Sequence, residues 1–473
     1  MKFPFVGGSY KARSSFVDSS ETINLYPELS NKTQTSKAIA ALYGCPGLKL
    51  WGNCAGGTIR GLHRFSATQS VIVSGMNVYL VTTGAVSQLV GTIDNDTTPA
   101  MMDNNGIVIM IVTGAFGYFL DPVALTVTQI VNTAFQGADN VQFIDGYFCF
   151  NHPQTGQFQI TGLYSENIDA LDFATAEGYP DNLLSIIVDH REIWLFGELT
   201  TEIWQDTGNV LFPFAPIAGA FIEMGTAAKF SPVKMDDTVY WLAADKHGKG
   251  TIQKANGYQP VRVSNHAIEY AINQYSRIDD AIGYSYQQEG HNFYMLTFPT
   301  ANVTWCYDSA SDEWHKRAYR DPNTALLGRH LSQNHMAFAG LNLVGDYSNG
   351  NVYQLDLNTY TDNGAIMPAI RQTPYMYADG RWMFFKRLYI DMEVGVGLVT
   401  GEDPQIMLNW SDDGGQTFDN EIQSSAGKVG ERTLRQTFNR LGKSRGRVWR
   451  ITITDPVKRV LIGADAIYSE GQF

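Results

Sequence analysis

Apolar and polar residues alternate along most of the chain in short runs, and Gly, Asp or Asn turns separate these runs. Residues 185–208 show the pattern well, with an alternating run at Ile186 and Val188, a polar turn at 189–191, and two further runs. Period-two alternation broken by short polar turns is typical of an antiparallel meander. The sequence therefore predicts an all-β protein.

Similar units recur along the chain and start at Val71, Val108, Val141, Ser185, Val233, Tyr284 and Met336. Their turns, which we place at Gly75, Gly114, Gly146, His190, Asp237, Gly290 and Gly340, are 39, 32, 44, 47, 53 and 50 residues apart. Units of this length, stacked radially, form a β-propeller, whose strand edges are short and protected. A solenoid has a similar period but usually carries a regular consensus, which is absent here. We expect six or seven blades.

Composition divides the chain into three parts. Residues 1–56 are rich in Ser, Gly and turn residues, and they indicate an irregular N-terminal arm that closes the ring or reaches a neighbouring subunit. Residues 57–364 hold the repeats and are expected to form the propeller. Residues 365–473 contain several strand patterns without the propeller period, which favours a C-terminal β-sandwich.

Three segments favour helix over strand. Residues 36–42 are compatible with a helix in the arm, and residues 220–228 form a short helix-favouring piece after the fourth unit. Ile268, Ala271, Ile272 and Tyr275 have helical spacing, which predicts a surface helix between the fifth and sixth units.

The net charge of −13 is unevenly distributed. Residues 365–473 contain 14 Lys plus Arg and 13 Asp plus Glu, so they carry +1, and the first 364 residues carry −14. The acidic part is not expected to bind nucleic acid by neutralising phosphates.

No run of eighteen apolar residues occurs, so we expect no membrane insertion. The N-terminus lacks an apolar segment of signal-peptide length, and export by that route is not indicated. The four cysteines have neither CxxC spacing nor a nearby His cluster, which favours reduced, scattered thiols, although a Cys45–Cys54 disulfide is conceivable. We expect folding in a reducing cytoplasm.

The most specific local motif is SDDGGQTF, residues 411–418, which matches the Asp-box hairpin turn also found in sialidases. Asp413 is expected to cap turn amides, Gly415 to adopt positive φ and Phe418 to pack under the turn, with Ser411 and Thr417 completing the motif. This turn is a folding device and not a catalytic site. The motif lies after the repeats rather than within them, which argues against a sialidase.

Other candidate chemistry is weaker. Glu289, His291, Asp308, Glu313 and His315 could form acid–base sets, but residues 305–314 resemble two strands of a blade with buried aromatic residues. The HGKG at 247–250 lacks P-loop spacing, and HLSQNH at 330–335 lacks zinc-helix spacing. We therefore expect no catalytic residues, no metal and no cofactor.

A basic segment extends from Lys428 to Arg459, with ten Lys or Arg and two acids. It is either a solvated face or a docking surface for an acidic partner or DNA. The candidate interface residues within it are Arg440, Lys443, Arg445 and Arg447.

Several strings together resemble the packaged-DNA stabilisation family, the tail accessory or head-completion proteins of short-tailed phages. These strings are INLYPE (23–28), LYGCPGL (42–48), IWLFGELTTEIWQDTG (193–208), AGAFIEMGTAA (218–228), YQQEGHNFYMLTFP (286–299), TWCYD (304–308), WHKR (314–317) and RLGKSRGRVWRITITDPV (440–457). No single string is diagnostic, and the resemblance rests on their order.

The resemblance implies a propeller-type virion protein of the tail, assembled in the host cytoplasm and without enzymatic activity. It implies a homo-oligomeric tail hub or nozzle, with six copies around the DNA channel below the portal and its adaptor. Such a ring retains packaged DNA and attaches the tail needle and the spikes or fibres. DNA would pass through its lumen without sequence-specific binding, and acidic walls would not retard it.

Two alternatives remain open at this stage. A propeller glycan hydrolase or carbohydrate-binding protein would cleave or bind saccharides as an isolated chain. A bacterial surface-binding propeller is disfavoured by the missing signal peptide.

Overall fold

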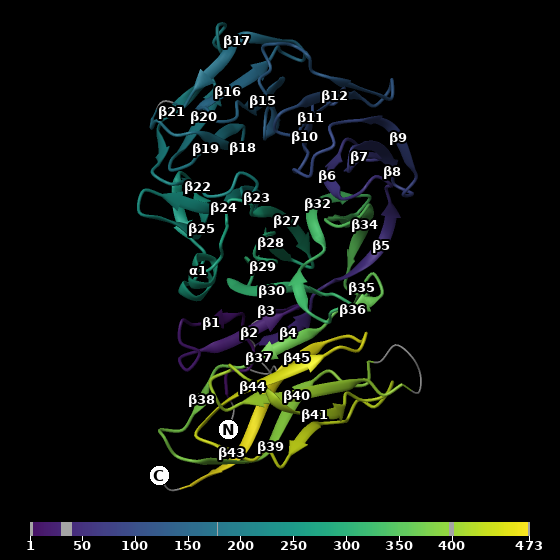
Figure 1. Cartoon of the computed structure of the whole chain (residues 1–473), viewed down its shortest axis with the longest axis vertical. Coiled ribbons are helices and arrows are strands. Elements are labelled where there is room, and N and C mark those ends of the chain that lie inside the picture. Colours follow the sequence, from purple (N-terminus) through teal and green to yellow (C-terminus); the bar gives the residue numbers. More distant parts are fainter. Residues whose placement is uncertain (1–2, 30–39, 177, 397–401, 472–473) are drawn as a thin grey trace.

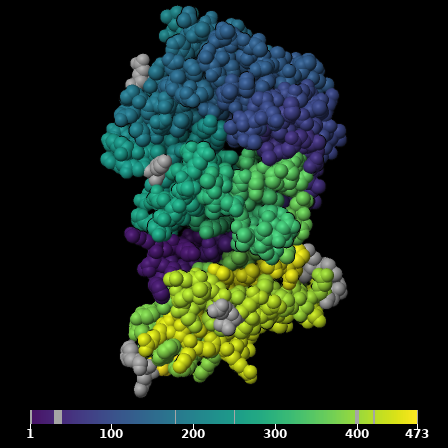
Figure 2. Space-filling view, in the orientation of Figure 1, coloured from purple at the N-terminus to yellow at the C-terminus, as the bar shows by residue number. Residues whose placement is uncertain are grey.

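The computed structural model describes residues 3–29, 40–176, 178–396 and 402–471. The chain forms a ring of sheets and, beside it, a two-sheet layer (Figure 1). The N-terminal strands lie between these two parts, as the purple segments in Figures 1 and 2 show. Within the described residues, no helix is long and apolar enough to cross a membrane.

The ring is a seven-bladed β-propeller in which the chain runs from the inner to the outer strand of each blade. Blades one to three are β6 (Ile59–Arg64), β7 (Gln69–Ser74), β8 (Asn77–Thr82) and β9 (Ser87–Thr92); β10 (Met101–Asn104), β11 (Ile109–Val112), β12 (Gly117–Asp121) and β13 (Thr126–Gln129); and β14 (Val141–Ile144), β15 (Tyr147–Asn151), β16 (Gln157–Thr161) and β17 (Ile168–Thr175). Blades four and five are β18 (Leu183–Asp189), β19 (Glu192–Gly197), β20 (Thr201–Asp206) and β21 (Phe214–Ile222); and β23 (Val233–Met235), β24 (Thr238–Asp245), β25 (Gly248–Asn256) and β26 (Gln259–Arg262), with β22 (Gly225–Thr226) beside β24. Blades six and seven are β27 (Ile282–Gln288), β28 (His291–Phe298), β29 (Val303–Asp308) and β30 (Glu313–Arg320), with β31 (Leu327–Arg329) beside β30; and β32 (Ser332–Phe338), β33 (Leu341–Asp346), β34 (Asn351–Asp356) and β5 (Gly47–Asn53).

Both faces of each blade are buried, and this explains the continuous apolar runs in the middle strands. On β7, Val71 and Val73 pack against blade two, whereas Ile72 packs against blade seven. Successive side chains of a strand point to opposite faces, so one strand supplies two interfaces. Seven separate apolar clusters result, one at each junction between blades.

The ring is closed by a strand from the other end of the propeller sequence. β5 pairs antiparallel with β34 and is the fourth strand of blade seven. Leu48 of β5 is fully buried between blades six and seven, and Leu50 on the same strand is 50% exposed. Pairing of this kind removes the open edge that blade seven would otherwise present.

Side-chain polar contacts also join neighbouring blades near the turn between their first and second strands. Arg191 donates from Nη2 to Asp145 Oδ1 at 2.7 Å, and Lys234 lies 2.7 Å from Asp189 Oδ1. The other contacts of this set are Asn104 to His63 (2.7 Å), the Phe143 amide to Asp103 (2.7 Å), Asn292 to Asp236, and Asn342 to the Gln287 carbonyl (2.8 Å). Burial lowers the pKa of His63 to about 4, and burial raises the pKa of Asp103 to about 6. Because these contacts link the turns between first and second strands from one blade to the next, those turns lie on one face of the propeller.

The second part is a β-sandwich, and N-terminal strands enter both of its sheets. The first sheet runs β2 (Ser19–Ile23), β37 (Ala369–Gln372), β44 (Gly446–Ile453), β40 (Gln405–Ser411) and β41 (Asp419–Ser425), with β1 (Tyr10–Lys11) and β38 (Met376–Tyr377) at its side. The second sheet runs β3 (Leu25–Leu29), β4 (Ala40–Gly44), β45 (Val460–Glu470), β39 (Met383–Met392) and β42 (Gln436–Asn439), with β43 (Lys443–Ser444) beside β39. The two short strands β35 (Thr361–Asp362) and β36 (Ala365–Ile366) join the closing strand β5. Phe5, Leu25 and Leu42 lie in the sandwich core with Trp449.

A buried asparagine holds the point where the chain crosses from one sandwich sheet to the other. Asn24 has φ of 54°, a left-handed conformation that Asn adopts more readily than most residues. Its Nδ2 donates to the carbonyls of Ala318 (2.8 Å) and Pro368 (2.9 Å), and its Oδ1 accepts from the Ala318 amide (3.0 Å). One side chain thus links the arm, blade six and the segment that leads into the sandwich.

Several expectations from the sequence require correction. The arm is not irregular: the strands β1 to β5 form within its described residues, and the apolar side chains Phe5, Leu25 and Leu42 of the arm complete the sandwich core. Residues 220–228 are not a helix but the end of β21 followed by β22, since their apolar residues pack between blades four and five. Of the helix expected over 36–42, residues 36–39 lie outside the described residues and 40–42 are in β4.

Other expectations are confirmed. α1 (His266–Asn273) forms between blades five and six, with Asn265 as its N-cap. Five of the seven anticipated turn residues mark the turn after a blade's first strand, and Gly75 and Gly114 mark the turn after the second. The four cysteines are buried and free, so Cys45 and Cys54 form no disulfide.

Truncation of the closing strand tests the ring. Leu48→Ala is expected to lower the free energy of unfolding by about 2–5 kcal/mol, because it leaves a cavity between blades six and seven. Leu50→Ala, at a half-exposed position of the same strand, is the matched control and should change it by less than about 1 kcal/mol. Urea denaturation of both variants measures the difference. Equal effects of the two substitutions would contradict a closing role for Leu48.

A histidine with two acidic partners joins blade six to the arm. His291 Nδ1 lies 2.9 Å from Asp308 Oδ2, and its Nε2 lies 2.7 Å from Glu28 Oε2 on β3. The hydrogen bond to Asp308, aided by that to Glu28, raises the pKa of His291 to about 9 against the opposing effect of burial. The ring is therefore charged at neutral pH and donates to both carboxylates.

This contact predicts a specific pH dependence of stability. The pKa of histidine in an unfolded chain is about 6.5, so the contact contributes fully below that pH and its contribution is lost as pH rises toward 9. The loss amounts to at most about 3 kcal/mol. Urea midpoints at pH 6 and pH 9 should therefore differ more for the wild type than for His291→Gln. His247→Gln, on an exposed turn, is the control and should follow the wild type, and a parallel response of all three proteins would contradict the prediction.

Candidate partner interface

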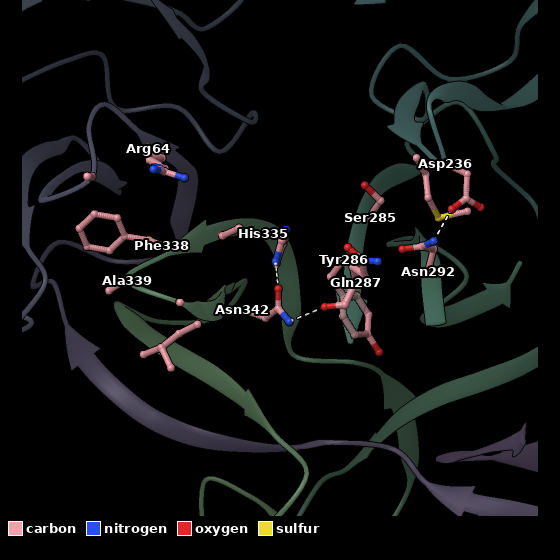
Figure 3. A pocket seen from close by; sticks show the side chains of 15 residues that line it. Arg64, Asp236, Ser285, Tyr286, Gln287, Asn292, His335, Phe338, Ala339 and Asn342 are labelled. Carbon is pink, nitrogen blue, oxygen red and sulfur yellow. Dashed lines mark hydrogen bonds between the residues drawn. The ribbon is translucent and has the colours of Figure 1, made fainter. Parts of the chain in front are cut away.

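A cavity of about 600 Å³ opens where the inner strands of blades one, five, six and seven meet (Figure 3). Arg64, Asp236, Asn292 and Asn342 line it, and the bonds of Asn292 to Asp236 and of Asn342 to Gln287 bridge neighbouring blades across its wall. Among the described residues that line the cavity, Asp236 is the one carboxylate. The cavity therefore does not present the carboxylate pair with which most glycosidases cleave sugars.

Three of the residues considered for acid–base chemistry, His291, Asp308 and His315, are buried within the fold. His291 and Asp308 meet in the seam contact between blade six and the arm, and Glu289 lies exposed on the turn before β28. His315 is fully buried, and burial lowers its pKa to about 3. In the described parts of the chain, no three His, Cys, Asp or Glu side chains are arranged to hold a metal ion.

The turn at 411–418 connects β40 to β41. Asp413 Oδ1 accepts from the amides of Gln416 (2.9 Å) and Thr417 (3.0 Å), and its Oδ2 accepts from Thr417 Oγ1 (2.6 Å). Ser411 Oγ accepts from the Gly415 amide at 2.8 Å, and Gly415 has φ of 90°. The hydrogen bond that Ser411 Oγ donates to Asp413 Oδ1 (2.5 Å), together with those from Thr417 and Gln416, holds the pKa of Asp413 well below its usual range. The ring of Phe418 lies 3.5 Å from the guanidinium of Arg450.

Arg447 is buried inside the sandwich, so the prediction that it belongs to a surface interface is wrong. Its guanidinium donates to both Asp412 oxygens at 2.6 and 2.8 Å and to the Leu441 carbonyl. It stacks near the rings of Phe385, Trp410 and Trp449. A buried Arg must be paired and hydrogen-bonded in this way, so it is not available to a partner.

The other three candidate cations lie on the outer side of the second sandwich sheet. We call this region the basic surface; it comprises Trp382, Phe384, Lys386, Arg387, Arg440, Lys443 and Arg445. β43 pairs with β39 so that Lys443 stands opposite Phe384. Lys443 Nζ and the Arg445 guanidinium lie 4.8 and 5.1 Å from the centre of the Trp382 ring. The sheet thus presents cations together with exposed aromatic rings.

The charges of the basic surface are not neutralised within the chain. Lys386, Arg440, Lys443 and Arg445 are exposed and, among the described residues, have no acidic group within 4.0 Å. Arg387 donates to Asn439 (2.9 Å) and to the Tyr389 hydroxyl (3.0 Å), which are both neutral. A depression of about 900 Å³ lies between Lys386, Arg440 and Ile467. Unpaired cations beside exposed aromatic rings suit a partner whose contact surface is acidic and has apolar groups at the centre of that surface.

Sequence reasoning missed the half of this surface that β39 contributes. The run RWMFFKR, residues 381–387, is one of the strand patterns expected within residues 365–473. Its alternation contains the missing signal, because Trp382, Phe384 and Lys386 occupy the positions opposite to the buried Met383 and Phe385. Large aromatic residues on a solvent-facing side are a feature of binding surfaces.

Comparison with solved structures finds matches of low sequence identity. The WD40 β-propeller domain of Doa1 is 10% identical over 65% of this chain and 96% of that one, with a TM-score of 0.42. The extracellular domain of the putative one-component system BT4673 from B. thetaiotaomicron is 11% identical over 82% of this chain and 48% of that one, with a TM-score of 0.47. The search of curated protein sequences gave no match.

Two family profiles match nearly the whole chain. The β-propeller profile of bacteriophage P22 Gp10 matches residues 1–360, and the β-sandwich profile of the same protein matches residues 369–468. They follow the two parts of the observed fold, and the match includes the N-terminal strands and the closing strand β5. The chain therefore belongs to the bacteriophage P22 Gp10 family of DNA-stabilisation proteins and is a structural phage virion protein, not an enzyme.

Proposed function

We propose that this structural phage protein forms a ring of six copies below the portal and its adaptor, where it retains packaged DNA and attaches distal tail parts. The family assignment of both the propeller and the sandwich carries this proposal. The ring is the tail hub or nozzle of a short-tailed phage, assembled in the host cytoplasm, and it holds the needle and the spikes or fibres.

Charge distribution is consistent with a channel that DNA passes without adhering to it. The first 364 residues carry −14, so the propeller and its arm repel the phosphate backbone over distances of about a Debye length, roughly 8 Å at physiological salt. Retention of DNA in such a ring is steric and does not depend on phosphate binding. The excess of basic residues is confined to the sandwich, where it is available for contacts with acidic protein surfaces.

The basic surface is the proposed docking surface. Its unpaired cations and exposed rings resemble the centre of a protein interface, where aromatic residues and Arg are enriched. Each subunit of a ring below the portal must contact neighbouring proteins. The basic surface, with its cations and exposed aromatic rings, has a composition that suits one of these contacts.

Electron microscopy of the purified protein, alone and mixed with portal–adaptor particles, tests the proposal. We expect six-membered rings that dock coaxially on the portal, because a subunit with one repeated contact closes into a ring around the DNA axis. The images report the copy number and the docked position directly. A persistent monomer that ignores the portal would contradict the proposal, and binding to glycans would then be tested on the same sample.

A further inference from the structure

One face of the propeller combines acidic and apolar groups, and we call it the turn face. It carries the turns between first and second strands, which the polar contacts described above join around the ring. Because successive strands of a blade are antiparallel, the turn between the third and fourth strands lies at the same end of each blade. In blade three the two turns touch, since the Tyr164 amide donates to the Gly146 carbonyl at 2.7 Å.

Four consecutive blades place an aliphatic side chain in solvent at equivalent positions of the turn face. These residues, at the turn between third and fourth strands, are Val86, Val123, Leu163 and Leu211, and they are between 58% and 90% exposed. The equivalent turns of blades five and six are Gly257–Tyr258 and the Ser-Ala-Ser-Asp turn at 309–312, which has no large aliphatic residue. The apolar arc therefore lies on the part of the ring away from the sandwich, which adjoins blade six (Figure 1).

Acidic residues accompany this arc. Glu166 and Asp169 flank the tip of blade three, within this arc, and Asp237 and Glu289 lie outside it, on the turns of blades five and six. All four are exposed, and within the described chain no Lys, Arg or His lies within 4.0 Å of their carboxylates. Arg191 is the one Lys or Arg on these turns, and it is paired with Asp145. The turn face is thus acidic and aliphatic, and the basic surface of the sandwich is cationic and aromatic.

We propose that the basic surface of one copy docks on the turn face of the next copy, over blades one to four. This inference rests on the proposed ring and specifies the contact between neighbouring copies within it. A ring of more than two copies held by one kind of contact must join two different patches of the subunit. This chain carries two such patches, with opposite charge and with apolar groups at each. Complementary charge fixes the orientation of docking, while burial of the apolar arc and of Trp382 and Phe384 supplies the affinity.

Charge reversal tests the contact with two double variants. Lys443→Glu/Arg445→Glu alters the basic surface, and Glu166→Lys/Asp169→Lys alters the turn face. Each is expected to raise the concentration needed for assembly, measured by mass photometry, at least about tenfold, because like charges then face each other. Lys246→Glu/Arg277→Glu makes the same change of charge away from both patches and should assemble as the wild type does. Circular dichroism verifies that each variant is folded.

Mixing the two altered proteins gives a sharper result. The unaltered basic surface of one variant can dock on the unaltered turn face of the other, so the mixture should form dimers or larger assemblies although each variant alone does not. Rings that form normally from either variant, or a mixture that remains monomeric, would overturn the contact while leaving the ring intact. A wild-type chain that stays monomeric at micromolar concentration would overturn the ring and the contact together.

Discussion

Closure of the propeller by β5 is the constraint on which the rest of this structure depends. A seven-bladed ring assembled from consecutive strands alone would leave blade seven with three strands and β34 as an open edge, and an unpaired strand edge is a template for pairing with other chains. The pairing of β5 with β34 satisfies that edge, but it fixes residues 47–53 beside residues 351–356. Everything that precedes β5 must then begin from blade seven, next to the point where the chain leaves the propeller. The N-terminal strands are therefore placed where the sandwich forms, and they become part of both its sheets.

The propeller and the sandwich consequently behave as one structure. β2 pairs in parallel with β30 of blade six through Ile23 and Lys316, so the first sandwich sheet continues the sheet of a blade. Buried polar side chains make this seam specific. Arg371 donates to the carbonyls of Phe5 (2.6 Å) and of Gly7 and Gly8 (3.0 Å), and Asn24 and His291 hold the strands that follow. Because each of these groups would be costly to bury without its partners, the seam tolerates one arrangement of the arm.

The surfaces of the two parts differ in a way that suits an assembled tail. The propeller carries most of the negative charge, and exposed apolar residues mark one arc of its turn face. The sandwich carries cations without acidic partners beside aromatic rings on its second sheet. A virion protein that contacts several neighbours needs surfaces that are distinct from one another, since specificity depends on rejecting the wrong partner as well as binding the right one.

The sequence by itself determined the elements that depend on local pattern. Period-two alternation with polar turns predicted the blades, and the helical spacing of Ile268 and Ile272 predicted α1. A β-sandwich was expected over residues 365–473 because their strand patterns lack the propeller period. Strings in a definite order also indicated the family, which the two profiles confirm. These features could be predicted because each depends on neighbours within a few residues or on the order of motifs along the chain.

Tertiary structure decided what depends on contacts distant in the sequence. The arm looked irregular because its few apolar residues, among them Phe5, Leu25 and Leu42, acquire a core only when residues 365–473 supply the rest of it. Residues 220–228 became strand because a neighbouring blade covers them, which overrides their helical preference. Arg447 and Arg445 are equivalent in the sequence, yet one is buried against Asp412 and the other is exposed beside Trp382. Local pattern specifies a strand and its turn, but which face of the strand meets solvent is set by packing partners that lie dozens or hundreds of residues away.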